Sequence, residues 1–140
     1  MRKIVFIFFF PVLLSACKKQ APAAPIESQT VILTSGTWRL TASTIDGLTD
    51  VYATLPDCRK DDYLRFNTNG TVETNEGPST CNATDPQVQL AQWKFLNDFA
   101  NSIKIGDKEY YVDLLNDNVF KIRTATTDPY VNKRILTYGR

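Results

Sequence analysis

Few residues in this sequence are suited to catalysis, and its three cysteines are the most reactive of them. The 140 residues include Cys17, Cys58 and Cys81 but no histidine. Without histidine the usual general base and the commonest metal ligand are both missing, so a Ser/His/Asp or Cys/His site cannot be built. We therefore expect no catalytic residues, no metal ion and no cofactor, and the chain is predicted not to be an enzyme.

Carboxylates gather around the second cysteine. Asp57, Asp61 and Asp62 stand in the sequence beside Arg59 and Lys60. One interpretation is a calcium or sugar site, since carboxylate oxygens are suitable ligands for Ca²⁺. The other is a solvated loop in which acids and bases form weak ion pairs. We favour the solvated loop.

The net charge argues against a nucleic-acid partner. The chain has 16 basic and 15 acidic residues, and removal of Arg2 and Lys3 with a signal peptide would leave 14 against 15. Nucleic-acid binding normally requires a basic stripe with interleaved aromatic residues. Here the basic residues are scattered among acidic residues along the whole chain, so this function is not expected.

Residues 1–16 have the layout of an export signal. Arg2 and Lys3 precede an apolar run over residues 4–14, and its eleven residues fall short of the roughly 20 that a transmembrane helix needs. The next four residues read Leu-Ser-Ala-Cys and end at Cys17. This order resembles the lipobox of bacterial lipoproteins, in which the cysteine is acylated and becomes the first residue. The alternative is an ordinary signal peptide with a cysteine at the cleavage site by chance.

The lipobox resemblance implies an anchor at Cys17 and a location in the cell envelope. Residues 17–30 are polar and carry Pro and Ala, which predicts a flexible lipidated tether. More than one acyl chain on Cys17 would hold the protein stably on a membrane. We expect the outer membrane, with a monomeric domain in the periplasm or at the cell surface.

Assignment of Cys17 to the lipid leaves an even pair of cysteines. Cys58 and Cys81 would lie in an oxidising compartment, where only one connectivity is possible, so we predict a disulfide between them. The alternative, a catalytic or redox thiol, is disfavoured because the two are far apart in sequence, lack a Cys-x-x-Cys arrangement and have no histidine to activate them. The disulfide would also consume the thiolates that zinc needs.

The elements that must position these residues are short strands bounded by Gly, Asn, Asp or Pro, a pattern typical of an all-β domain. Asn69 and Gly70 favour positive φ and predict a tight hairpin turn. The change of apolar phase within residues 88–95 predicts a bulge or a bend. Eight strands are expected, over residues 37–43, 63–66, 71–74, 88–95, 102–105, 109–114, 119–125 and 131–138.

Alternation within these strands predicts which side chains point inward. In the first strand, Trp38, Leu40 and Ala42 share one face. The residues expected to face a core are Trp38, Leu40, Leu64, Phe66, Trp93, Ile103 and Ile105. Those on the opposite phase, expected to face solvent, are Arg39, Arg65, Lys94 and Lys104.

Several short motifs together resemble a known family. They are Trp38-Arg39-Leu40, Cys58, Phe66-Asn67 with Asn69-Gly70, Glu76-Gly77, Cys81 and Trp93-Lys94-Phe95. The combination is similar to the lipocalin-like domain of small lipoproteins from Bacteroidetes. The order Gly36-Thr37-Trp38 also resembles the start of true lipocalins, where the tryptophan closes the base of the barrel. The resemblance implies an all-β, eight-stranded antiparallel up-and-down barrel over residues 31–140, lipocalin-like and with one disulfide.

An eight-stranded barrel is just wide enough to be filled by side chains or to hold one small ligand. Our leading hypothesis is a membrane-anchored lipoprotein that binds a small apolar or amphipathic molecule in the cell envelope. The rival is a structural or interaction lipoprotein with a filled barrel that contacts an envelope protein or polysaccharide. An enzyme with paired carboxylates is the least favoured. A cavity lined by apolar residues would favour the first hypothesis.

Overall fold

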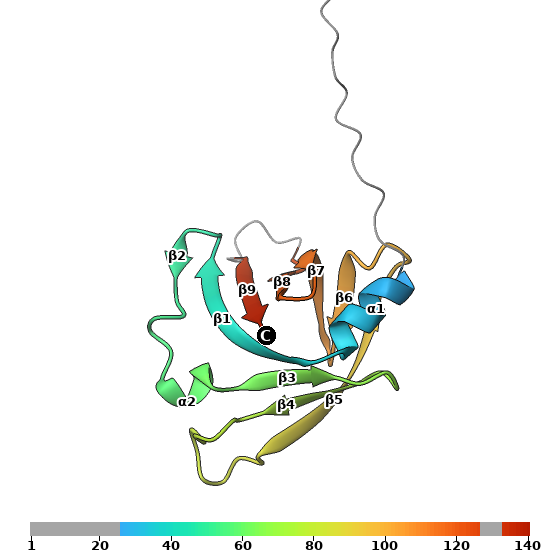
Figure 1. Cartoon of the computed structure of the whole chain (residues 1–140). Helices are drawn as coiled ribbons and strands as arrows, with labels where there is room; N and C mark the ends of the chain where they lie inside the picture. The colour runs from blue at the N-terminus through green and yellow to red at the C-terminus, as the bar shows by residue number, and fades with distance from the viewer. Residues whose placement is uncertain (1–25, 127–132) are drawn as a thin grey trace, which may run out of the picture.

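Nine antiparallel strands form one sheet that closes on itself when the first strand pairs with the last (Figure 1). The computed structural model describes residues 26–126 and 133–140. The strands are β1 (Thr37–Ile45), β2 (Thr49–Asp50), β3 (Tyr63–Phe66), β4 (Thr71–Asn75), β5 (Val88–Phe95), β6 (Ser102–Ile105), β7 (Lys108–Leu115), β8 (Val119–Thr124) and β9 (Arg134–Gly139), and the helices are α1 (Ile26–Thr34) and α2 (Asp57–Lys60).

The expected all-β barrel of eight antiparallel strands is confirmed. Seven of the eight strands lie where alternation placed them to within about two residues. The eighth begins at Arg134, and its expected start at Val131 lies outside the described residues. The ninth, β2, is a two-residue addition that pairs only with the end of β1.

The turn between β3 and β4 is tight, as predicted, but of the two residues expected to favour positive φ only Gly70 adopts it and Asn69 does not. Gly70 has φ of +82°, and its N–H donates to the carbonyl of Asn67 over 3.1 Å. The side-chain oxygen of Asn69 accepts from the N–H of Thr71 over 3.0 Å, so the turn is held at both positions. This tight connection sets the register in which Phe66 pairs with Val72.

One end of the barrel is closed by α1, an element absent from the sequence prediction. Residues 26–30 were expected to belong to a flexible tether, but the helix already begins at Ile26. Leu33 of this helix is completely buried, and its carbonyl accepts a 2.8 Å hydrogen bond from the indole N–H of Trp38. The helix therefore belongs to the folded domain, and it contacts β3 and β7.

Aromatic side chains fill the barrel next to α1. Trp38, Phe66, Trp93 and Phe120 are all buried and lie with neighbouring ring centroids 5.5–5.7 Å apart. Such tilted and edge-to-face contacts add to the free energy gained by burial. The remaining buried members of this core are Leu33, Val72, Ile103, Leu115 and Ile122.

The predicted inward residues follow their expected phase. Trp38, Phe66, Trp93 and Ile103 are buried, while Leu40, Leu64 and Ile105 are half-buried. On the opposite phase, Arg39, Arg65 and Lys94 are exposed and Lys104 is half-buried.

Of the bulge or bend predicted within residues 88–95, the bulge is wrong, because β5 keeps an unbroken register with β4 from Val88 to Gln92. Val88 and Leu90 instead lie on the exposed phase of the strand, and Leu90 is 70% exposed. Register shifts occur elsewhere, between Leu40 and Ala42 in β1 and between Val112 and Leu114 in β7. In β1 and β7, therefore, the side chains change faces at positions where the residue types did not indicate a bulge.

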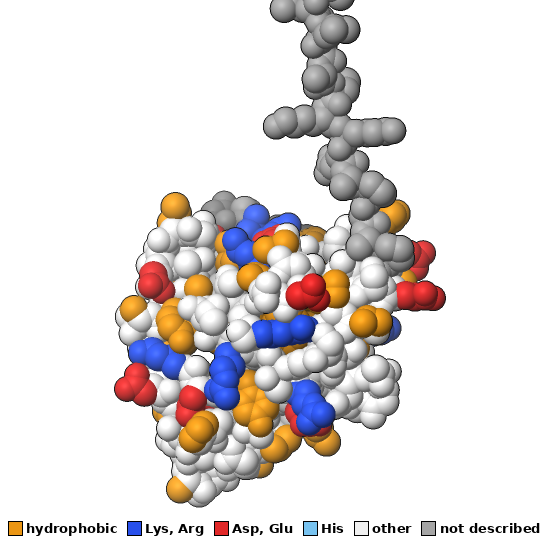
Figure 2. Space-filling view, in the orientation of Figure 1, with side chains coloured by type: hydrophobic (Ala, Val, Ile, Leu, Met, Phe, Trp, Pro, Cys, Tyr) orange, Lys and Arg blue, Asp and Glu red, His pale blue; other side chains and the backbone are white. Residues whose placement is uncertain are grey.

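The signal peptide over residues 1–16, the lipidation of Cys17 and the tether up to residue 25 lie outside the described residues. No helix among the residues that are described is long and apolar enough to cross a membrane. Figure 2 shows basic and acidic side chains interspersed on the face in view, as their scattering along the sequence suggests.

Candidate ligand-binding site

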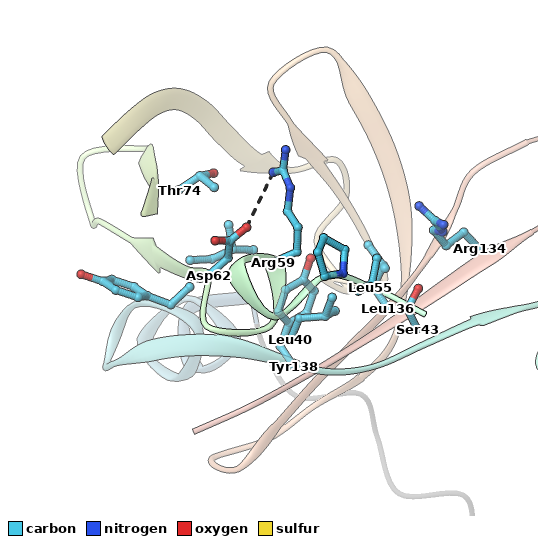
Figure 3. Close-up of a pocket in the computed structure, with 12 residues that line it drawn as sticks. Leu40, Ser43, Leu55, Arg59, Asp62, Thr74, Arg134, Leu136 and Tyr138 are labelled. Atoms are coloured by element: carbon cyan, nitrogen blue, oxygen red, sulfur yellow. Dashed lines mark ion pairs between the residues drawn. The ribbon is translucent and has the colours of Figure 1, made fainter. Parts of the chain in front are cut away.

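A cavity of about 440 Å³ opens at the end of the barrel opposite α1. The placement follows from chain direction, because β1 starts beside α1 and carries Ser43 to its far end. The volume lies within the range of about 300–1,000 Å³ usual for small-molecule pockets. Figure 3 shows the lining residues, which are Leu40, Ser43, Leu55, Pro56, Arg59, Asp62, Tyr63, Leu64, Thr74, Arg134, Leu136 and Tyr138.

The inner wall of the cavity is apolar. Leu40, Leu64 and Leu136 come from three strands, and the ring of Tyr138 lies among them. Tyr138 stacks on the buried Phe120 with ring centroids 5.8 Å apart, so the aromatic core forms the floor. The barrel is therefore filled by side chains at the α1 end and hollow at the other.

Burial governs the chemistry of the tyrosine on this wall. Removal from water, and to a lesser degree the neighbouring Tyr110, raise the pKa of Tyr138 far above its usual value of 10.0. The phenol stays neutral across the physiological range, because desolvation disfavours the charged form. Tyr138 thus contributes an apolar ring and an uncharged hydroxyl to the cavity.

The mouth of the cavity is formed by the segment that includes α2. Leu55, Pro56 and Arg59 from this segment line the opening. A disulfide joins Cys58 in α2 to Cys81, which confirms the predicted pairing. It ties the mouth segment to the long connection between β4 and β5, so the rim is held covalently at one point.

The three acidic residues around Cys58 do not converge on one site. Asp57 pairs with Lys60 over 3.1 Å on the surface, and a carboxylate oxygen of Asp61 accepts from the N–H of Ser79 over 2.9 Å. Only Asp62 reaches the cavity. Within the described part of the chain, no group of acidic or cysteine side chains is arranged to hold a metal ion. Asp57 is therefore exposed and ion-paired, as expected for a solvated loop and not for a calcium or sugar site.

Asp62 pairs with Arg59 at the mouth over 3.7 Å. Desolvation raises the pKa of the Asp62 carboxyl above 3.8, Arg59 counteracts this, and the nearby carboxylates of Glu76 and Asp61 raise it further. One oxygen of Asp62 is buried and has no hydrogen-bond partner among the described residues. This side of the cavity is therefore polar but close to charge-neutral.

Ser43 is a site residue that alternation placed on the wrong face. The register shift between Leu40 and Ala42 turns Ser43 inward in place of Ala42. Ser43 is 2% exposed, and its hydroxyl oxygen has no hydrogen-bond partner among the described residues. A buried hydroxyl without a partner is costly and therefore uncommon in folded proteins.

Arg134 completes the polar lining, on the same wall as Ser43. It starts β9 and pairs with Ile45, two residues beyond Ser43 on β1. Its guanidinium forms no ion pair within the described residues. Nothing in the sequence distinguished Arg134 from other basic residues, because its role depends on the register of β9 against β1.

A comparison with protein families agrees with the barrel fold. A search of curated proteins finds no match. A family model described as a lipocalin-like domain matches residues 34–122, which is well over half of the chain. The matched region runs from the end of α1 into β8 and so contains most of the barrel and the disulfide. The chain belongs to the lipocalin-like domain family.

Proposed function

We propose that this protein is a lipid-anchored envelope protein whose barrel binds one small apolar or amphipathic molecule, rather than an enzyme. The observation that carries the proposal is the cavity of about 440 Å³ at the open end of the barrel, above a floor of packed aromatic rings. An interaction protein of the rival kind would have a filled barrel, whereas this one is hollow at one end.

The lining suits a ligand with an apolar body. Four apolar side chains form the inner wall, and each Å² of apolar surface removed from water contributes roughly 25 cal/mol. The closed barrel also keeps the site preformed, since its walls are strands that pair with their neighbours in one sheet. A preformed site reduces the ordering cost of binding.

The proposed anchor suits the position of the mouth. Cys17 precedes the first residue of α1, Ile26, by nine residues, which extend to about 30 Å at most. Because α1 closes the end opposite the cavity, a lipid on Cys17 would attach the domain by its closed end. The mouth would then point away from the membrane surface, and a ligand would enter from the aqueous side.

A neutral fluorescent probe tests the binding function. N-phenyl-1-naphthylamine brightens in apolar sites, and titration of the purified chain should give a saturable increase with one site per monomer. Leu55→Trp places a larger side chain in the mouth and should weaken binding at least about tenfold. Leu48→Trp is the matched control, because Leu48 lies in the turn before β2 and is 89% exposed.

The control variant should bind the probe like the original chain. Absence of saturable binding to the original chain would refute the proposed function. Equal weakening by both substitutions would place the probe outside the cavity.

A further inference from the structure

We propose that the ligand carries a small anionic group at one end, and that Arg134 and Ser43 hold this group at the rim of the cavity. The proposal rests on the proposed binding function and adds the charge and orientation of the ligand. It assigns the apolar body to the wall formed by Leu40, Leu64 and Leu136.

The first argument is placement. Ser43 on β1 pairs directly with Leu136 on β9, and Arg134 lies two residues before Leu136. Since side chains two apart on a strand share a face, Arg134 and Leu136 lie on the same face of β9, with Arg134 exposed at the start of the strand, and Ser43 faces them from the next strand. Figure 3 shows Ser43, Leu136 and Arg134 on one side of the cavity and the Arg59–Asp62 ion pair on the other.

The second argument is the unsatisfied hydroxyl. Only 2% of the surface of Ser43 is exposed, so the residue is 98% buried. Its hydroxyl oxygen has no hydrogen-bond partner among the described residues. Ser43 is one of the residues that line the cavity, and its buried hydroxyl can donate one hydrogen bond. An oxygen of the ligand would supply the missing acceptor.

The third argument is the balance of charge. Three charged side chains line the cavity, namely Arg59, Asp62 and Arg134. Arg59 and Asp62 pair with each other at 3.7 Å, which leaves Arg134 as the one charged side chain of this lining without an ion pair among the described residues. A guanidinium presents several N–H donors that match the oxygens of a carboxylate or phosphate. A cationic ligand would be repelled by Arg134, and an uncharged ligand would leave it unpaired.

The two polar residues and the leucine wall together define an amphiphile. Its anion accepts hydrogen bonds from Arg134 and Ser43, and its chain descends past Leu136 toward the aromatic floor around Tyr138. A single chain with a terminal carboxylate or phosphate monoester has this chemistry.

Displacement of N-phenyl-1-naphthylamine by three probes of equal chain length tests the charge. The probes are decanoate, decanol and decylammonium, used at pH 8 with a chain carrying Cys17→Ser, which has no acyl group of its own to compete. Decanoate should bind about tenfold more tightly than decanol, as expected for hydrogen bonds to a charged group, and decylammonium most weakly.

Two variants identify the residues. Arg134→Gln should reduce the preference for decanoate over decanol to within about threefold while leaving the affinity for decanol unchanged, and Ser43→Ala should reduce the preference several-fold. Arg65→Gln is the control, because Arg65 is exposed on the outer phase of β3. It should keep the full preference.

The outcomes separate this inference from the function on which it rests. Equal binding of decanoate and decanol, with the fluorescent probe still displaced, would overturn the anionic group and leave the binding function intact. A preference that survives Arg134→Gln, or that Arg65→Gln removes equally, would overturn the assignment to Arg134. Failure of every probe to bind would overturn both proposals.

Discussion

The guanidinium of Arg140 lies over the indole ring of Trp38, 4.2 Å from the ring centroid. The same guanidinium donates to the carbonyl of Ile32 and, over 2.7 Å, to the hydroxyl of Ser35. Arg140 therefore joins the residue after β9 to the last turn of α1 and to the start of β1. A cation over an aromatic face is stabilising, and the two hydrogen bonds fix its orientation.

Arg140→Ala should lower the free energy of unfolding by about 1–2 kcal/mol, since one cation–π contact and hydrogen bonds to α1 are lost together. Urea denaturation followed by tryptophan fluorescence measures this change. Arg65→Ala, on the exposed phase of β3, is the control and should stay within about 0.5 kcal/mol. Equal stabilities of the two variants would mean that Arg140 does not hold the closed end.

Leu33→Ala should destabilise the domain by about 2–5 kcal/mol, because it leaves a cavity between α1 and the core. Val31→Ala in the same helix is a matched control, since Val31 is 66% exposed and its truncation should cost less than about 0.5 kcal/mol. Thermal unfolding of both variants provides the comparison. A small effect of Leu33→Ala would contradict the placement of α1 in the domain.

Removal of the disulfide should cost about 2–5 kcal/mol of stability. The double variant Cys58→Ala/Cys81→Ala avoids a free thiol and can be compared with the original chain in denaturant. Addition of dithiothreitol should bring the original chain to the stability of the variant and leave the variant itself unchanged. Two free thiols in the unreduced protein by mass spectrometry would argue against the bond.

Asp62 predicts a dependence of stability on pH. Burial raises its folded pKa above the ordinary 3.8, so the folded state holds this proton more tightly than the unfolded state. The contribution is fully present below pH 3.8 and is lost as pH rises through the folded pKa. The free energy of unfolding of Asp62→Asn, relative to that of the original chain, should therefore increase from pH 3 to pH 7.

Urea unfolding of both chains at several pH values measures that difference. Asp98→Asn, on the exposed connection between β5 and β6, controls for removal of a surface charge. If the free energy of unfolding of Asp62→Asn, relative to that of the original chain, does not increase with pH, this would contradict the effect of burial on the pKa of Asp62.

Cys17→Ser should abolish labelling by radioactive or alkyne-tagged fatty acid and release the protein from membranes. The lipid on this cysteine is the proposed anchor, and two acyl chains are what stable anchoring requires. Fractionation of cells into soluble and membrane parts provides the measurement. Unchanged membrane partitioning of the variant would refute the anchor.

Periodicity predicted the strands because apolar and polar residues alternate where one face of a strand is buried and the other is exposed. Trp38, Phe66, Trp93 and Ile103 were placed inward from their phase alone, and all four are buried. The Asn69-Gly70 turn was equally predictable, since positive φ at Gly70 is a local property of the residue. Local sequence patterns were therefore sufficient to predict the barrel strands and the side chains that fill the end next to α1.

The hollow half depended on non-local register. Ser43 enters the cavity only because β1 shifts by one residue against β9, and Arg134 faces it only through that pairing. The helix α1 was missed because its polar face and short length resemble a tether, and Leu33 is its one buried residue. Such features depend on tertiary contacts, which a single sequence does not display.

The seam between β1 and β9 also determines how the chain folds. The hydroxyl of Thr41 donates to the carbonyl of Thr137, 96 residues away, whereas the β3–β4 hairpin closes through a four-residue turn and the disulfide spans only 23 positions. Contacts between distant residues form slowly, because the entropy of closing the long loop must be lost first. We expect the hairpin to form early and the seam last. Until then both edge strands stay unpaired, and this open intermediate is the species most prone to aggregate.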